Sequence, residues 1–125
     1  MSENSTTLQI MIVDDDPVFR RGVRQLVDHL DNVSLSTEAK NGQEAREKAI
    51  EYAPDVVLLD YQMPKLDGAT AARRILAVRP KTKLIGISAH LDKRSAAAMI
   101  DAGVIALFAK SDGPSKLLDL LKTLS

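Results

Sequence analysis

The chain has 125 residues, 45% of them hydrophobic and 27% charged, and its formal net charge at pH 7 is +0. This length suits one domain with its own core, and the balanced charge gives no broad attraction to nucleic acid or anionic lipid. The absence of cysteine excludes disulfides and thiolate chemistry and argues against a zinc site. No apolar run approaches the ~20 residues of a membrane span, so we expect a cytoplasmic protein that does not enter membranes.

In chain order, the polar segment 1–7 lacks the apolar stretch of a signal peptide, and we expect it to be disordered ahead of a single domain at 8–125. Short apolar runs then alternate with segments of helical periodicity. The runs predict strands at 8–13, 33–37, 56–59, 84–87 and 104–108. The periodic segments predict helices that span 19–30, 45–53, 69–76, 92–102 and 117–124.

This alternation predicts an α/β fold, in which a parallel sheet carries helices on both faces. Four of the runs are almost continuously apolar and are expected inside the sheet, whereas VSLST (33–37) alternates and suits an edge. Right-handed crossovers make 2-1-3-4-5 a common order, which is the doubly wound (βα)5 flavodoxin-like sandwich. In that order strands 1 and 3 are neighbours at the switch point, where ligands bind beyond the strand ends.

The first strand ends in three consecutive aspartates, which raises a question of repulsion. Two carboxylates ~5 Å apart at an effective dielectric of ~20 repel by roughly 3 kcal/mol. Asp16 precedes Pro17, and an aspartate before a proline that begins a helix is a good N-cap. The unexplained acids are therefore Asp14 and Asp15.

Polar residues also follow the other apolar strands: Asp60 after the third, Ser88 after the fourth and Lys110 after the fifth. Asp14, Asp15 and Asp60 could be solvated loop acids, but their convergence favours a divalent cation. Mg²⁺ is preferred because it binds few carboxylates and keeps positions open for water and phosphate. A carboxylate can attack phosphorus to give an aspartyl-phosphate, with a lysine and a hydroxyl to balance the charge. The simpler roles are a snorkelling lysine for Lys110 and a turn hydroxyl for Ser88.

At this point the segments IVDDDP, VVLLDYQMPKLDG, IGISAH and AGVIALFAK carry a family resemblance. Together they resemble the receiver domain of bacterial two-component response regulators, from Ile10 to the last helix. Within this family the chain is most similar to regulators with a helix-turn-helix DNA-binding output domain, the NarL/FixJ/LuxR type. The features that carry this similarity are DPVFRRGV, SAH and a lysine that is not followed by proline.

The resemblance implies a role for each matching residue. Asp60 matches the phospho-acceptor, Asp14 and Asp15 match the metal-binding pair, and the carbonyl of Gln62 matches the third protein contribution to Mg²⁺. Lys110 matches the phosphate-contacting lysine. Ser88 matches the switch hydroxyl, and Ala89 matches the small residue that leaves room for the phosphoryl group. Pro64 and Gly68 match the loop that shapes the site.

Two positions depart from the family pattern. Asp16 stands where the most similar regulators have histidine, and either residue can cap the helix. The switch aromatic normally lies three residues before the lysine, where this chain has Leu107. Phe108 comes one place later and, by strand alternation, should face the other side of the sheet. His29 is expected on the surface and His90 in a loop.

The leading hypothesis is a phosphoacceptor switch that receives a phosphoryl group on Asp60 from a histidine kinase or phosphotransfer protein. It would catalyse only its own phosphorylation and dephosphorylation and would control an output, with transcription favoured. A homodimer fits this class, and this domain is not expected to bind nucleic acid. The alternatives are a phosphate-independent interaction module, which only Leu107 supports, and a magnesium-dependent phosphatase with its nucleophile after strand 1.

Overall fold

The computed structural model describes residues 7–63 and 66–124. Its strands are β1 (Leu8–Val13), β2 (Val33–Ala39), β3 (Val56–Asp60), β4 (Lys83–Ser88) and β5 (Ala106–Ala109). Its helices are α1 (Pro17–Asp28), α2 (Gly42–Tyr52), α3 (Gly68–Val78), α4 (Lys93–Asp101) and α5 (Pro114–Leu124), with a short 3₁₀ turn, η1 (Lys110–Asp112). Two predictions concern residues outside the described part of the chain: the disorder of residues 1–6 and the site-shaping role of Pro64.

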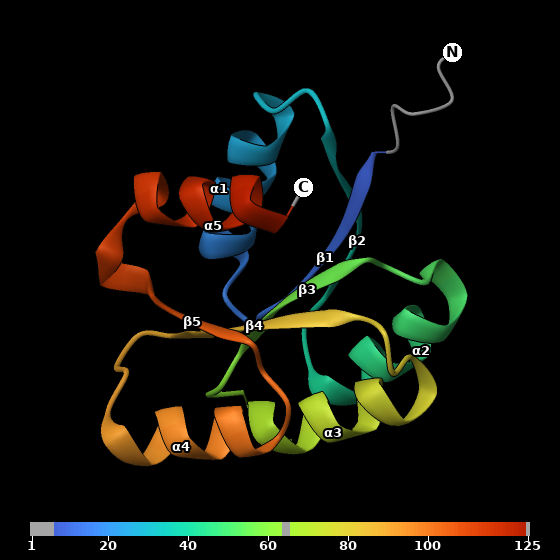
Figure 1. Ribbon diagram of the computed structural model, residues 1–125, viewed down its shortest axis with the longest axis vertical. Helices are drawn as coiled ribbons and strands as arrows, with labels where there is room; N and C mark the ends of the chain where they lie inside the picture. Colours follow the sequence, from blue (N-terminus) through green and yellow to red (C-terminus); the bar gives the residue numbers. More distant parts are fainter. Residues whose placement is uncertain (1–6, 64–65, 125) are drawn as a thin grey trace.

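All neighbouring strands are parallel, and their order is β2-β1-β3-β4-β5. Helices α1 and α5 cover one face of the sheet, and α2, α3 and α4 cover the other (Figure 1). The predicted three-layer α/β architecture and the predicted strand order are therefore confirmed. In the described part of the chain no helix is both long and apolar enough to span a bilayer.

The prediction that all four apolar strands lie inside the sheet was wrong for β5, which forms the second edge. Its apolar residues are explained by helices packed on both of its faces: Phe108 is buried with α1 and α5, and Leu107 packs toward α4. β5 also begins later than predicted. The amide of Val104 donates to Met99 O at 3.1 Å, so this residue closes the turn after α4 instead of starting the strand.

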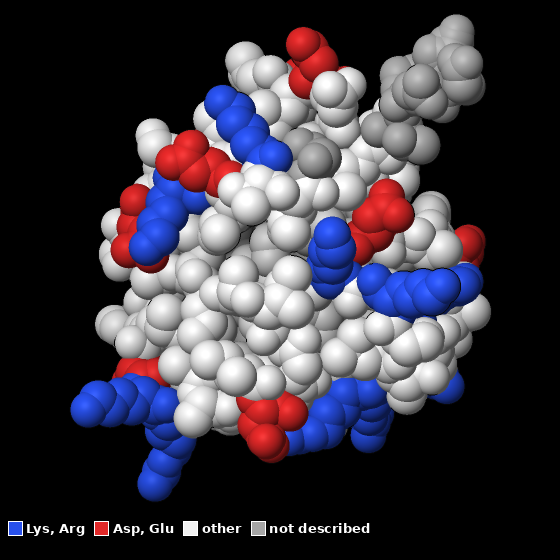
Figure 2. Space-filling view, in the orientation of Figure 1, with Lys and Arg blue, Asp and Glu red and all other residues white. Residues whose placement is uncertain are grey.

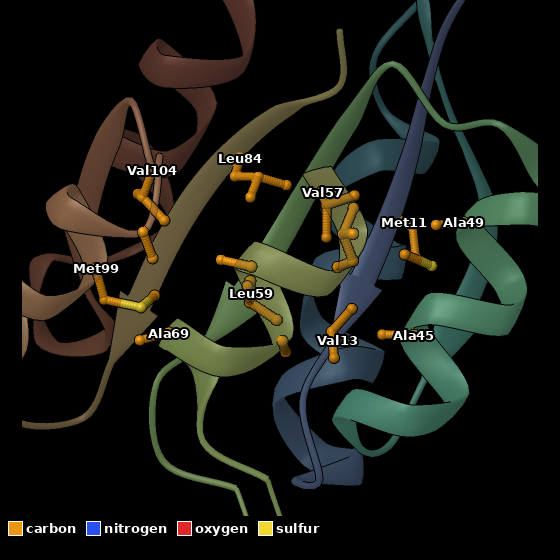
Figure 3. Packing of buried hydrophobic residues seen from close by; sticks show 14 of the residues in the cluster. Met11, Val13, Ala45, Ala49, Val57, Leu59, Ala69, Leu84, Met99 and Val104 are labelled. Atoms are coloured by element: carbon orange, nitrogen blue, oxygen red, sulfur yellow. The ribbon is translucent and has the colours of Figure 1, made fainter. Parts of the chain in front are cut away.

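Two apolar clusters hold the layers together, one on each face of the sheet. Small side chains such as Ala45, Ala49 and Ala69 let α2 and α3 approach Met11, Val13, Val57 and Leu59 closely, and Met99 closes the α4 side (Figure 3). On the opposite face Val23 and Val27 of α1 meet Leu117 and Leu121 of α5 over Ile10, Ile12, Leu58 and Phe108. A sheet buried on both faces explains why β1 and β3 are apolar along most of their length.

Acidic or amide side chains cap the helices that begin at the carboxyl edge of the sheet. Asp16 accepts from the amide of Val18 at 2.9 Å, which confirms its predicted capping role. Asn41, Asp67 and Asp92 cap α2, α3 and α4 in the same way. Each cap side chain accepts from a backbone amide in the first turn of its helix, so the caps hold the helix starts in place around this edge of the sheet.

Glycine at position 68 is required by a close backbone approach. A Cβ at Gly68 would lie 2.4 Å from the carbonyl oxygen of Asp60, and the Gly68 amide donates to Tyr61 O at 2.7 Å. The start of α3 therefore rests directly on the backbone that carries Asp60. This contact agrees with the expectation that Gly68 shapes the site.

Candidate functional site

The carboxyl ends of β1, β3, β4 and β5 bring the predicted polar residues to one edge of the sheet. Asp14, Asp60 and Ser88 are buried, and Asp15 is exposed. Single carboxylate oxygens of Asp14, Asp15 and Asp60 all lie within 4.8 Å of one another. The structure thus assembles the three acids that the sequence analysis singled out.

Asp14 is held by contacts in several directions. Its amide donates to Ala39 O at 3.0 Å, and its Oδ1 accepts from the amide of Asp16 at 2.9 Å. Its carbonyl oxygen accepts from Arg20 Nη1 at 2.6 Å. Oδ2 is the remaining oxygen and has no hydrogen-bond donor of suitable geometry, although it is buried.

Lys110 supplies the positive charge that faces these acids. Its Nζ lies 2.8 Å from Asp14 Oδ2, an ion pair without the directional geometry of a hydrogen bond, and 3.9 Å from Asp60 Oδ2. The same Nζ lies 4.5 Å from the centroid of the Phe19 ring. A cation held between carboxylates and an aromatic face is oriented toward the site rather than into solvent, so the snorkelling alternative for Lys110 does not fit.

Asp60 is the most perturbed acid of the site. Burial, followed by the nearby charge of Asp14, raises the pKa of Asp60 from 3.8 to about 7, while Lys110 acts in the opposite direction. The amide of Gln62 donates weakly to Asp60 Oδ1 at 3.4 Å. The attraction of one ammonium therefore does not compensate for burial and for a second carboxylate.

This donor set fits a hard divalent cation. All three side chains offer carboxylate oxygens, which are the ligands that Mg²⁺ prefers. Asp14 and Asp60 are both buried, and burial together with the charge of Asp14 raises the pKa of Asp60 even though Lys110 faces both acids. This describes excess negative charge that a second cation would balance.

Ser88 and its neighbours form the loop after β4. Ser88 Oγ donates to His90 O at 2.9 Å and accepts from the His90 amide at 3.2 Å, so the hydroxyl currently serves a local turn. Ala89, His90 and Gln62 are exposed around the edge. The predicted loop position of His90 and surface position of His29 are confirmed.

Leu107 and Phe108 point to opposite faces of the sheet, as strand alternation predicted. Phe108 is 1% exposed in the cluster under α1 and α5. Leu107 packs against the cluster under α4, and a Cβ placed on Gly86 would lie 3.0 Å from Leu107 Cδ2. Phe108 therefore cannot substitute for an aromatic residue at position 107 without a change of strand register.

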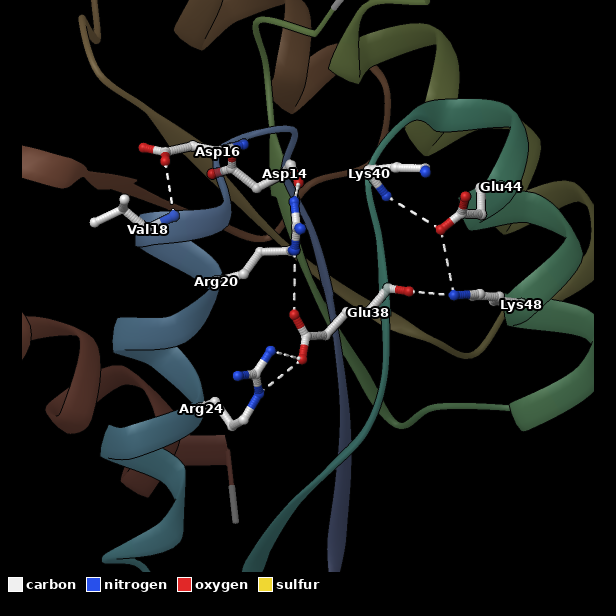
Figure 4. Close-up of polar contacts among 9 residues, drawn as sticks. All are labelled: Asp14, Asp16, Val18, Arg20, Arg24, Glu38, Lys40, Glu44 and Lys48. Carbon is white, nitrogen blue, oxygen red and sulfur yellow. Dashed lines mark hydrogen bonds and ion pairs between the residues drawn. The ribbon is translucent and has the colours of Figure 1, made fainter.

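Sequence reasoning did not recognise three residues that contact the site or hold it. Phe19 entered the sequence analysis only as the first residue of the predicted helix 19–30, although its ring faces Lys110. Arg20 contacts the Asp14 carbonyl, and Glu38 accepts from Arg20 (Figure 4). A basic residue one turn after an acidic strand end is the signal that could have identified Arg20. No pattern in the sequence pairs it with Glu38.

Comparison with known proteins agrees with this geometry. Residues 10–122 match the family described as response regulator receiver domain. A LuxR-family two-component response regulator from an Aurantimonas species superposes with a TM-score of 0.89 at 28% identity, covering 95% of this chain and 85% of that one. The signal receiver domain of NarL from Mycobacterium tuberculosis gives 0.87 at 28% identity, covering 95% and 97%.

Curated relatives are longer proteins of two kinds. The transcriptional regulatory protein DegU of Brevibacillus brevis is 28% identical over 122 residues, which cover 98% of this chain and 52% of DegU. A protein-glutamate methylesterase/protein-glutamine glutaminase of Carboxydothermus hydrogenoformans is 35% identical over 112 residues, covering 88% and 31%. The chain therefore spans about half, or less, of the length of these relatives.

A parallel 2-1-3-4-5 sheet with an acidic edge, one facing lysine and one hydroxyl defines a class of phosphate-responsive signalling domains. The chain belongs to the response regulator receiver domains, the signalling switches of two-component systems.

Proposed function

We propose that Asp60 is the phospho-acceptor and that Asp14, Asp15, Asp60 and the Gln62 carbonyl bind Mg²⁺. The observation that carries this proposal is the convergence of three carboxylates within 4.8 Å, opposite the ammonium of Lys110. Mg²⁺ would neutralise charge on the phosphoryl oxygens and lower the pKa of Asp60. The acids lie at the switch point of a doubly wound sheet, which is where such sheets bind their ligands.

The reaction transfers a phosphoryl group from a phosphohistidine nitrogen to a carboxylate oxygen of Asp60. The new P–O bond forms as the P–N bond breaks, and the imidazole takes up a proton as it leaves. Lys110 already lies 3.9 Å from Asp60 Oδ2, which places its charge beside the oxygens of the incoming group. Hydrolysis by water then returns Asp60 and inorganic phosphate.

Ser88 is proposed as the switch hydroxyl. Its Oγ is occupied by the His90 carbonyl in this structure, so a contact with a phosphoryl oxygen requires that local hydrogen bond to break. A stronger, charge-assisted bond to phosphate would favour the exchange. The consequence is a rearrangement of the loop that leads into α4.

We propose transcription as the output and a sensor histidine kinase or phosphotransfer protein as the phosphoryl donor. The similarity to LuxR- and NarL-type structures and to DegU supports a DNA-binding partner domain, whereas the methylesterase relatives make an enzymatic output the second candidate. Neither the output activity nor nucleic-acid binding is assigned to this domain. A cytoplasmic location follows from the same proposal, because kinase phosphoryl groups come from intracellular ATP.

The charge pattern of the surface is compatible with a protein partner. Acidic and basic side chains are interspersed over the face seen in Figure 2, and neither sign gathers into a continuous patch. This face therefore offers no strong electrostatic footprint for nucleic acid. A homodimer remains part of the proposal, and sedimentation of the phosphorylated protein tests it.

The proposal is tested by incubation with acetyl phosphate and Mg²⁺, followed by intact-mass measurement and peptide mapping. Wild type should gain one phosphoryl group on Asp60, and Asp60→Asn should gain none. Asp101→Asn is the matched control, because Asp101 is an exposed acid that pairs with Arg73 away from the site. A wild-type protein that stays unmodified would support the phosphate-independent alternative instead.

A further inference from the structure

Arg20 connects the turn after β1 to the end of β2. From the first turns of α1, its Nη1 donates to the carbonyl oxygen of Asp14 at 2.6 Å, and its Nε donates to Glu38 Oε1 at 3.1 Å (Figure 4). The Arg20 side chain is 19% exposed. A planar guanidinium that contacts two fixed oxygens restrains both of them.

The contact with Asp14 acts on the geometry of the turn. The Asp14 carbonyl belongs to the same planar peptide as the amide of Asp15, so holding the oxygen holds that plane. The orientation of this plane decides where the Asp15 carboxylate lies relative to Asp14 Oδ2. The other bonds of Asp14, from its amide to Ala39 O and from Asp16 N to its Oδ1, leave this peptide plane without a restraint of its own.

Glu38 in turn fixes Arg20. Its Oε2 accepts from Arg24 Nε at 2.9 Å, and its backbone carbonyl accepts from Lys48 Nζ. Glu38 is therefore held by α1 and by α2 while it holds Arg20. Arg24 lies one turn further along α1 and is 50% exposed. Among the described residues it pairs with Glu38 and makes no hydrogen bond to the turn 14–16.

We propose that Arg20 is a positioning residue for metal binding: by fixing the Asp14–Asp15 peptide against Glu38, it sets the separation of the two acids that receive Mg²⁺. This inference rests on the proposed function of the acids. It assigns to Arg20 a role in the affinity of the site, although its side chain contacts only a backbone oxygen there.

Electrostatics and positioning predict opposite results for the same substitution. Arg20→Met removes a positive charge near the acids, and Coulomb's law alone then predicts tighter Mg²⁺ binding. Positioning predicts weaker binding, because the ligands must be ordered when the ion arrives. Arg24→Met is the matched control, since it removes a positive charge from the same Glu38 but keeps the Arg20 contact with the Asp14 carbonyl and the Lys48 contact with Glu38.

The experiment measures Mg²⁺ affinity by calorimetric titration at pH 8 for wild type, Arg20→Met, Arg20→Lys and Arg24→Met. We expect at least fivefold weaker binding for Arg20→Met and a change of less than twofold for Arg24→Met. Arg20→Lys keeps the charge but lacks the planar fork, so its affinity should fall between wild type and Arg20→Met. In the metal-free proteins, the Asp16 amide should exchange hydrogen at least fivefold faster in Arg20→Met than in Arg24→Met.

The outcomes separate this inference from the function on which it rests. If wild type does not bind Mg²⁺, the proposed function fails. If wild type binds and Arg20→Met binds equally well or more tightly, the metal site stands and the role of Arg20 is refuted. Should Arg20→Met fail to fold, Arg20→Lys decides: an affinity equal to that of wild type overturns the inference, and a weaker one supports it.

Discussion

Replacement of Asp60 by asparagine should stabilise the metal-free protein at alkaline pH. The amide has nearly the size of the carboxylate but carries no charge, so it removes both the desolvation cost and the repulsion from Asp14. These are the two causes that raise the pKa of Asp60 to about 7. The same substitution removes the proposed phospho-acceptor, and stability and activity should therefore change in opposite directions.

The magnitude and the pH window follow from proton linkage. The pKa of Asp60 is about 7 in the folded state and 3.8 ordinarily, so between about pH 4 and pH 7 the folded state holds a proton that the unfolded state has lost. The stability that Asp60 contributes is therefore complete below about pH 4, and it is lost as pH rises through the folded pKa of about 7. The full difference would be about 4 kcal/mol, and because relaxation and water penetration reduce the cost of a buried charge, we expect about 1–3 kcal/mol.

The assay is urea unfolding of wild type and Asp60→Asn in EDTA at pH 5 and pH 8.5. The variant should be about 1–3 kcal/mol more stable at pH 8.5, and roughly two fifths of that difference should remain at pH 5, where folded wild type still holds the proton that the unfolded chain has mostly lost. Asp101→Asn controls for a surface charge and should lie within about 0.5 kcal/mol of wild type. A stability gain that is absent at pH 8.5, or equal at both pH values, would refute the reasoning.

Three further predictions concern the metal, the phosphate and the switch. Millimolar Mg²⁺ should raise the melting temperature of wild type at pH 8 by mass action, and an unchanged midpoint would contradict the metal site. Replacing Gln62 and His90 together by alanine should change the rate of aspartyl-phosphate hydrolysis by tenfold or more, or ~1.4 kcal/mol of barrier; unchanged decay would exclude both side chains from the path of the attacking water. Leu107→Ala should retain the change in hydrogen exchange that beryllium fluoride induces over residues 90–95, because leucine is smaller than the usual aromatic and has little energy difference between its two positions. Loss of that change with normal binding of the mimic, or a largest wild-type change in β5, would show that Leu107 is part of the switch.

The sequence was sufficient for the alternation of strands and helices and for the acids at the strand ends, because these depend on short-range patterns, whereas the strand order was predicted from the handedness of the crossovers. Continuous apolar runs mark strands buried on both faces, and polar residues at their ends must meet at one edge of a parallel sheet. The N-cap at Asp16 was likewise predictable, since an aspartate, a proline and the following helix are adjacent in the chain. The opposite faces of Leu107 and Phe108 follow from the two-residue period of a strand.

Other features required the folded structure. The edge position of β5 could not be read from its composition, because helices on both faces bury an edge strand as thoroughly as a central one. The helix ends at Asp28 and Tyr52 depend on caps such as Ala53, whose φ of 45° is not a preference of alanine.

What the sequence alone determined is the set of groups: three acids, a hydroxyl and a lysine at the strand ends of a doubly wound sheet. What only the tertiary structure decided is how those groups are held. The repulsion among the acids is met in part by Lys110, which is oriented by Phe19, and the Asp14 backbone is fixed by Arg20 from α1. Such contacts join residues that share no periodic pattern, and they exist only once the sheet has brought its strand ends and helices together.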